Sequence, residues 1–65
     1  MYTVILQDSA GKTCSFKNVW AVQIEENYLC LVFSGYDMIL EKVPRFTVTY
    51  IDGVITIIGV NLESI

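Results

Sequence analysis

Short runs of alternating apolar and polar residues, separated by tight-turn residues, fill the chain, and no segment has the pattern of a long amphipathic helix. A period of two puts apolar side chains on one face of a β-strand, and that face has to be covered by another part of the chain. The 65 residues are enough for one domain. We therefore predict a single all-β domain over residues 1–65, an antiparallel barrel or sandwich of five to six short strands, similar in size to an SH3 domain.

The dipeptide Asp52-Gly53 is the strongest turn signal, because a type I′ turn needs positive φ at both central residues. It predicts a hairpin between residues 47–51 and 54–58. The opposite pairs expected in it are Tyr50 with Ile55, Val48 with Ile57, and Thr49 with Thr56.

A second hairpin is expected at the N-terminus, where a three-residue loop Ser9-Ala10-Gly11 with Gly11 in the left-handed region would join two apolar runs. The pairs that this loop length predicts are Leu6 with Cys14 and Val4 with Phe16. Lys17-Asn18 is then expected to link this hairpin to the next strand.

Residues 19–33 predict a third hairpin, folded about Glu26-Asn27, with one wholly apolar face. Its expected pairs are Trp20 with Phe33, Val22 with Leu31, and Ile24 with Leu29. A turn over residues 34–37 would add a strand with Met38 opposite Phe33 and Leu40 opposite Leu31. Trp20, Leu31 and Leu40 are therefore predicted to be sealed in the core.

A short helical turn near residues 37–43, starting from an Asp37 N-cap, is the competing interpretation of that strand. Val43-Pro44 is expected to form a corner, since proline cannot donate to a β-ladder. Gly59 is expected to mark a bulge or a close approach on the Phe46 side of the last strand.

The composition indicates self-association. Hydrophobic residues make up 54% of the chain and charged residues 17%, below the roughly 25% charged residues of ordinary soluble domains. The last hairpin offers apolar side chains on both faces, so we expect a homo-oligomer or a protein-binding module that uses this surface. The candidate interface residues are Ile51, Val54, Ile58 and Leu62, with the turn tyrosines Tyr28 and Tyr36. Alternatively, the N-terminal hairpin covers Ile51, Val54 and Ile58 within the same chain.

A formal charge of −3 makes nucleic acid an improbable partner, because phosphate binding relies on cations. Lys17, Lys42 and Arg45 give only a weak basic signal for a nucleic-acid-binding small barrel. The acidic balance suggests a second hypothesis, in which the chain is an inhibitor or adaptor that docks on a basic partner. The residues that would carry this docking are Glu25, Glu26, Asp37 and Tyr36.

The chain contains no histidine and no nucleophile or phosphate-binding motif, so we expect no enzymatic activity and no cofactor. Cys14 and Cys30 fall on different faces of their strands and are expected to be free thiols, without a metal site. No signal segment or bilayer-spanning run is visible, and a cytoplasmic location is expected.

Overall fold

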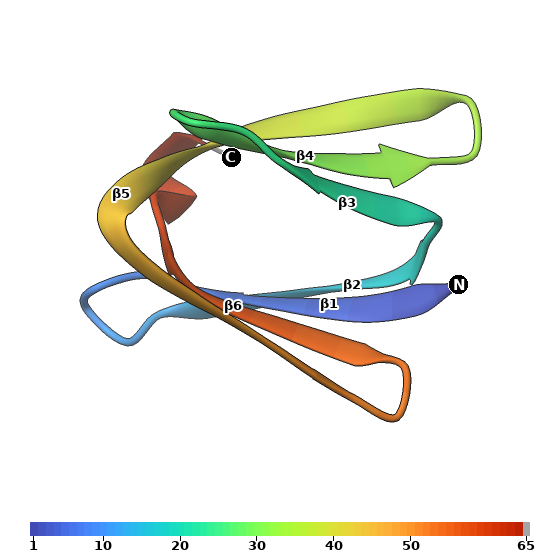
Figure 1. The fold of residues 1–65 in the computed structure, drawn as a ribbon, viewed down its shortest axis with the longest axis horizontal. Helices are drawn as coiled ribbons and strands as arrows, with labels where there is room; N and C mark the ends of the chain where they lie inside the picture. The colour runs from blue at the N-terminus through green and yellow to red at the C-terminus, as the bar shows by residue number, and fades with distance from the viewer. Residues whose placement is uncertain (65) are drawn as a thin grey trace.

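The computed structural model describes residues 1–64, which form six strands and a closing 3-10 turn (Figure 1). The elements are β1 (Tyr2–Gln7), β2 (Thr13–Val19), β3 (Ala21–Ile24), β4 (Tyr28–Phe33), β5 (Tyr36–Ile51), β6 (Val54–Val60) and η1 (Leu62–Ser64). The strands are hydrogen-bonded in the order β2-β1-β6-β5-β4-β3, and the sheet curls into a half-barrel. The predicted small all-β domain is confirmed.

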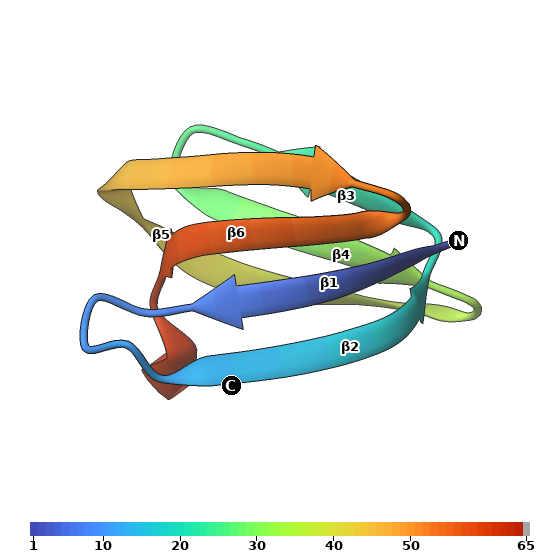
Figure 2. The ribbon, with the colours of Figure 1, turned by 90° about the horizontal axis from the view of Figure 1, so that it is seen from below.

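The curled sheet has two layers, with β2, β1, β6 and the second half of β5 in one and the first half of β5, β4 and β3 in the other (Figure 2). Only β5 is hydrogen-bonded within both layers, among the strands of residues 1–64. The layers are joined a second time where β2 runs into β3. The chain therefore folds back on itself at two corners.

The corner in β5 lies where the sequence placed it, at Val43-Pro44, but it is a bend inside one strand and not a break. Between the pairs Lys42–Val60 and Thr47–Ile58, β5 advances five residues while β6 advances two. Pro44 lies in this irregular stretch, where its missing N–H removes no ladder bond. The alternative of a helical turn over residues 37–43 is wrong, because residues 36–41 are paired with β4.

Gly59 lets β5 cross β6 closely at this bend. Its φ of 105° is unfavourable for a side chain. A Cβ added to Gly59 would lie 2.5 Å from the Arg45 carbonyl oxygen and 2.8 Å from the Phe46 Cα. The predicted close approach near Phe46 is confirmed.

The two terminal hairpins have the predicted registers. The pairs Leu6–Cys14, Val4–Phe16, Tyr50–Ile55, Val48–Ile57 and Thr49–Thr56 are all present. Asp52 and Gly53 have φ values of 49° and 79°, as a type I′ turn requires. In the first hairpin the Asp8 carboxylate accepts hydrogen bonds from the backbone N–H groups of Ala10 and Lys12, and these bonds stabilise the loop. Gly11 ends this loop in the left-handed region, with a φ of 87°.

The turn between β4 and β5 is shorter than expected. Ser34-Gly35 makes a two-residue turn, so Leu31 faces Met38 and Leu29 faces Leu40. The predicted pairs, Phe33 with Met38 and Leu31 with Leu40, are wrong by two residues. A shift of two keeps each side chain on its expected face, and Leu31 and Leu40 are buried as predicted.

Trp20 is the main error of the sequence prediction, because it is 52% exposed at the corner between β2 and β3. Asn18 has a φ of 60°, and β2 carries one extra residue opposite β1 between the pairs Val4–Phe16 and Tyr2–Val19. This bulge turns Val19 inward, where it is fully buried. Since consecutive strand residues point to opposite sides, Trp20 then points outward. Lys17-Asn18 is thus part of β2 and not a link.

One strand pair is parallel. β1 lies beside β6 with Val4 opposite Ile55 and Leu6 opposite Ile57. This pair differs from the antiparallel arrangement predicted from the sequence, in which only neighbouring strands could be paired. The core fills the space between the layers and consists of Val4, Leu6, Val19, Leu29, Leu31, Phe33, Leu40, Ile57, Val60 and Leu62. No helix within residues 1–64 is long and apolar enough to span a membrane.

Candidate interaction surface

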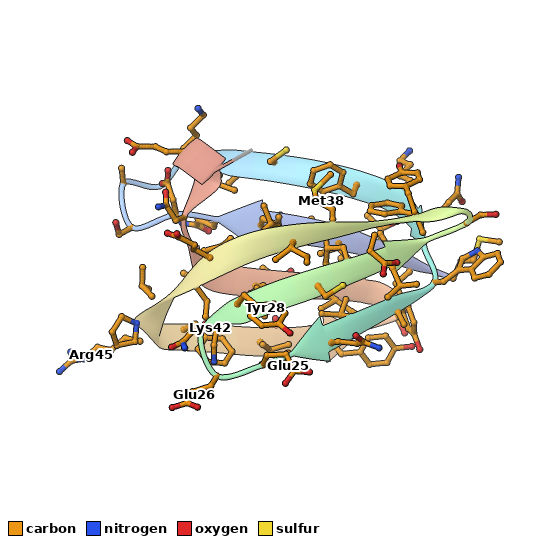
Figure 3. The ribbon with its side chains drawn as sticks, turned by 90° about the horizontal axis from the view of Figure 1, so that it is seen from above. Glu25, Glu26, Tyr28, Met38, Lys42 and Arg45 are labelled. Carbon is orange, nitrogen blue, oxygen red and sulfur yellow. The ribbon has the colours of Figure 1, made fainter. Side chains whose placement is uncertain are left out.

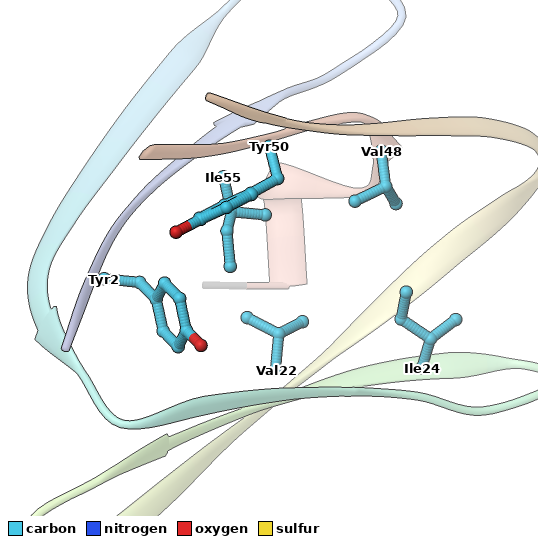
Figure 4. A pocket seen from close by; sticks show the side chains of 6 residues that line it. All are labelled: Tyr2, Val22, Ile24, Val48, Tyr50 and Ile55. Atoms are coloured by element: carbon cyan, nitrogen blue, oxygen red, sulfur yellow. The ribbon is translucent and has the colours of Figure 1, made fainter. Parts of the chain in front are cut away.

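An apolar groove opens where the edge of one layer passes over the edge of the other. Its volume is about 320 Å³. Six side chains line it: Tyr2, Val22, Ile24, Val48, Tyr50 and Ile55 (Figure 4). Val22 and Ile24 point into the groove from β3, and Val48 and Tyr50 point into it from β5 (Figure 4).

The groove side chains are held in place but poorly covered. The Tyr50 ring meets the Tyr2 ring edge-on, with centroids 5.9 Å apart, which positions it across the groove. Tyr50 is nevertheless 61% exposed, and Ile24 and Val48 are exposed too. The groove therefore offers apolar area that the chain itself does not bury.

The β5 rim of the groove is an unpaired strand edge. Residues 47–51 are hydrogen-bonded to β6 on one side, whereas β4 pairs only with residues 36–41. The two-residue turn makes Ile51 and Val54 a hydrogen-bonded pair, and such pairs alternate along an antiparallel ladder. The backbone N–H and C=O groups of Val48 and Tyr50 consequently point away from β6.

The β3 rim is also an edge, since β3 pairs with β4 alone. The Glu25 N–H donates to the Tyr28 carbonyl at 2.9 Å, and the same alternation then directs Gln23 toward β4. The backbone groups of Val22 and Ile24 therefore point to the open side. Both rims present the backbone of the residues whose side chains line the groove.

The β5 edge differs from the edge of β2 because it lacks features that prevent pairing with a strand of another chain. Natural edges are usually blunted by charges, proline or bulges. The edge of β2 carries Lys17 and the Asn18 bulge. Residues 47–51 read Thr-Val-Thr-Tyr-Ile and contain no charge, proline or bulge.

The predicted interface residues separate into exposed and buried members. Ile51 is 70% exposed, and Ile58 is exposed at the other end of the same outer hairpin face, while Val54, opposite Ile51, is half-buried. The prediction that Leu62 lies in the interface is wrong, because only 6% of Leu62 is exposed and it packs in the core. The N-terminal hairpin does not cover this face, since β1 extends the same sheet beside β6.

Tyr28 and Tyr36 are exposed as predicted, but they belong to the other layer. Tyr36 stacks on the Phe33 ring at 4.8 Å, and Tyr28 lies opposite Glu41. The fold does not bring these tyrosines together with Ile51 and Ile58.

The acidic candidates do not form one patch. Glu25 and Glu26 lie at the turn between β3 and β4, whereas Asp37 lies opposite Val32 near the other end of β4. Figure 3 shows Glu25 and Glu26 at the same end of the molecule as Lys42 and Arg45. Lys42 also makes a cation–π contact, because its Nζ lies 4.3 Å from the centroid of the Phe46 ring.

Both cysteines are free thiols, as predicted; Cys14 is half-buried and Cys30 is buried. Burial raises the pKa of the Cys30 thiol, and the carboxylates of Asp37 and Glu25 raise this pKa further. Cys30 is therefore held in its protonated form. Within residues 1–64, no three His, Cys, Asp or Glu side chains gather as a set that could hold a metal ion.

The groove was not identified from the sequence, although its members were placed on apolar strand faces. Alternation assigned Val22 and Ile24 to one hairpin face and Val48 and Tyr50 to another. Which of these faces would meet, and how completely, depends on how far β5 bends, and the local signal at Val43-Pro44 gives the position of the bend but not its extent. Comparisons with known protein families, with curated proteins and with solved structures found no match.

Proposed function

We propose that this chain is a non-enzymatic assembly module that associates with copies of itself through the hairpin formed by β5 and β6. The observation that carries the proposal is the uncharged, unpaired edge at residues 47–51, flanked by Tyr50 on the inner face and Ile51 on the outer face. An exposed edge of this kind is a template for pairing with another strand.

The groove supports binding rather than catalysis. Its lining is aliphatic apart from two tyrosines, so it offers apolar contact area and contains no histidine, carboxylate, thiol or amine side chain for acid–base chemistry. The separation of Glu25 and Glu26 from Asp37 weakens the alternative of an acidic docking surface. The two free thiols fit a reducing compartment, and we propose a cytoplasmic location.

Sedimentation velocity over a range of protein concentrations tests this proposal. We expect the wild-type chain to sediment as more than one copy of the 7.4 kDa monomer at micromolar concentration. Ile51→Glu should shift the chain toward monomer, because it places a carboxylate in the contact between copies, where the carboxylate loses hydration.

Ile39→Glu is the matched control, because this substitution makes the same change in charge at a residue that is 64% exposed on the other layer. This variant should sediment like the wild type. A wild-type chain that stays monomeric at every concentration, or equal effects of the two variants, would contradict the proposal.

A further inference from the structure

We infer that two copies of this chain join edge to edge along residues 47–51 of β5, antiparallel about a twofold axis that passes through Thr49. This inference rests on the proposed self-association and adds the surface, the register and the symmetry. It would extend the layer that contains β5 and β6 into one sheet continuous across both copies.

The backbone limits the possible registers. Val48 and Tyr50 are the residues whose N–H and C=O groups point outward from β5. Antiparallel edges bond where outward-pointing residues lie opposite each other, which allows a twofold axis through Val48, Thr49 or Tyr50. An axis through Val48 would pair Tyr50 with a residue of the irregular stretch at 43–46, and an axis through Tyr50 would pair Val48 with the turn residue Asp52. An axis through Thr49 keeps both pairs within residues 47–51, so Val48 of each copy would face Tyr50 of the other. Each such pair exchanges two hydrogen bonds, and Thr49 of one copy would lie opposite Thr49 of the second.

The charges at the ends of this segment are complementary under the same operation. Arg45 precedes the uncharged edge and Asp52 follows it. With Thr49 on the axis, Arg45 comes four residues before the axis and Asp52 three residues after it, so Arg45 of one copy lies toward the end of the contact that holds Asp52 of the second copy. A twofold interface has to be self-complementary, and this pairing brings opposite charges together at both ends.

The side chains of the second copy would also reduce the exposure of the groove. In a continuous sheet, Val48 and Tyr50 of both copies point to the same side. The half-exposed Ile24 and Tyr50 side chains lie on that side (Figure 4). Edge pairing thus joins the hydrogen-bonding edge and the uncovered apolar area in one contact.

The edge of β3 is a poorer candidate for the same symmetry. It offers four residues, Ala21–Ile24. Glu25 and Glu26 follow it, and residues 20–24 contain no cation to meet them. A second copy on this edge would lack the charge pairing that β5 provides.

Disulfide trapping tests the register, using a background in which Cys14 and Cys30 are replaced by alanine. Thr49→Cys should form a covalent dimer under mild oxidation, because residues opposite each other in a non-hydrogen-bonded pair have Cα atoms about 4.5 Å apart, within disulfide range. Thr47→Cys is the matched control on the same strand and face. Its two copies would lie about 13 Å apart along the strands, so we expect several-fold less covalent dimer.

Preferential linking of Thr47→Cys would overturn the register. Absence of linking in both variants, with a wild-type chain that sediments as an oligomer, would overturn the edge pairing and leave the proposed function intact. A wild-type chain that is monomeric throughout would overturn both, and would leave the β5 edge to a strand of a different protein.

Discussion

Single residues set the two corners of this fold, and each does so through backbone geometry rather than through a contact of its side chain. Gly59 allows β5 to cross β6 because no Cβ intervenes. Asn18 adopts positive φ and adds the residue that turns Val19 inward and Trp20 outward. Asn tolerates this conformation better than most residues.

Gly59→Ala should be strongly destabilising. The new Cβ would overlap Arg45 and Phe46, and φ is 105°. We expect a loss of about 2–4 kcal/mol in the free energy of unfolding measured with urea, a large part of the roughly 3–10 kcal/mol available to a domain of this size.

Gly35→Ala is the control for this prediction. Gly35 also has positive φ, but a Cβ there meets nothing within 4 Å, so the cost should be limited to about 1–2 kcal/mol of backbone strain. Equal losses in the two variants would show that the close approach of β5 to β6 contributes little.

At the scale of elements, local turn signals predicted hairpins well and the relations between hairpins poorly. Asp52-Gly53 and the loop ending at Gly11 each define a register from a few adjacent residues. The parallel pairing of β1 with β6 joins segments far apart in the chain, and alternation carries no information about it. The groove has the same origin, since it exists only where separate hairpins meet.

The β5 edge leads to a prediction for proline. The Val48 N–H points away from β6, so Val48→Pro removes only an outward donor, a position where edge strands accept proline. We expect this variant to keep its fold by circular dichroism and to sediment as a monomer. Thr49→Pro removes an N–H that bonds to β6 and should unfold the chain. A folded Val48→Pro variant that still associates like the wild type would contradict the edge interface.

For the whole molecule, the two layers should unfold together. β5 is hydrogen-bonded in both layers, and the core draws Leu29 and Leu31 from one layer and Leu6 and Ile57 from the other. Neither layer can bury its apolar face alone.

We therefore expect one cooperative transition in urea at a concentration where the chain is monomeric. Trp20 is the single tryptophan and reports on the corner between β2 and β3, whereas far-ultraviolet circular dichroism reports on all strands. The two signals should change at the same urea concentration. Separate midpoints would mean that the layers are independently stable.

The parallel pair formed by β1 and β6 has a consequence for biosynthesis. During translation, β1 (Tyr2–Gln7) is made long before β6 (Val54–Val60). β1 therefore has no parallel partner while residues 8–53 are being made. A contact between such distant segments forms late and slowly. The native sheet is thus completed only after residues 54–60 have left the ribosome. During that interval β2 is the only neighbouring strand with which β1 can pair.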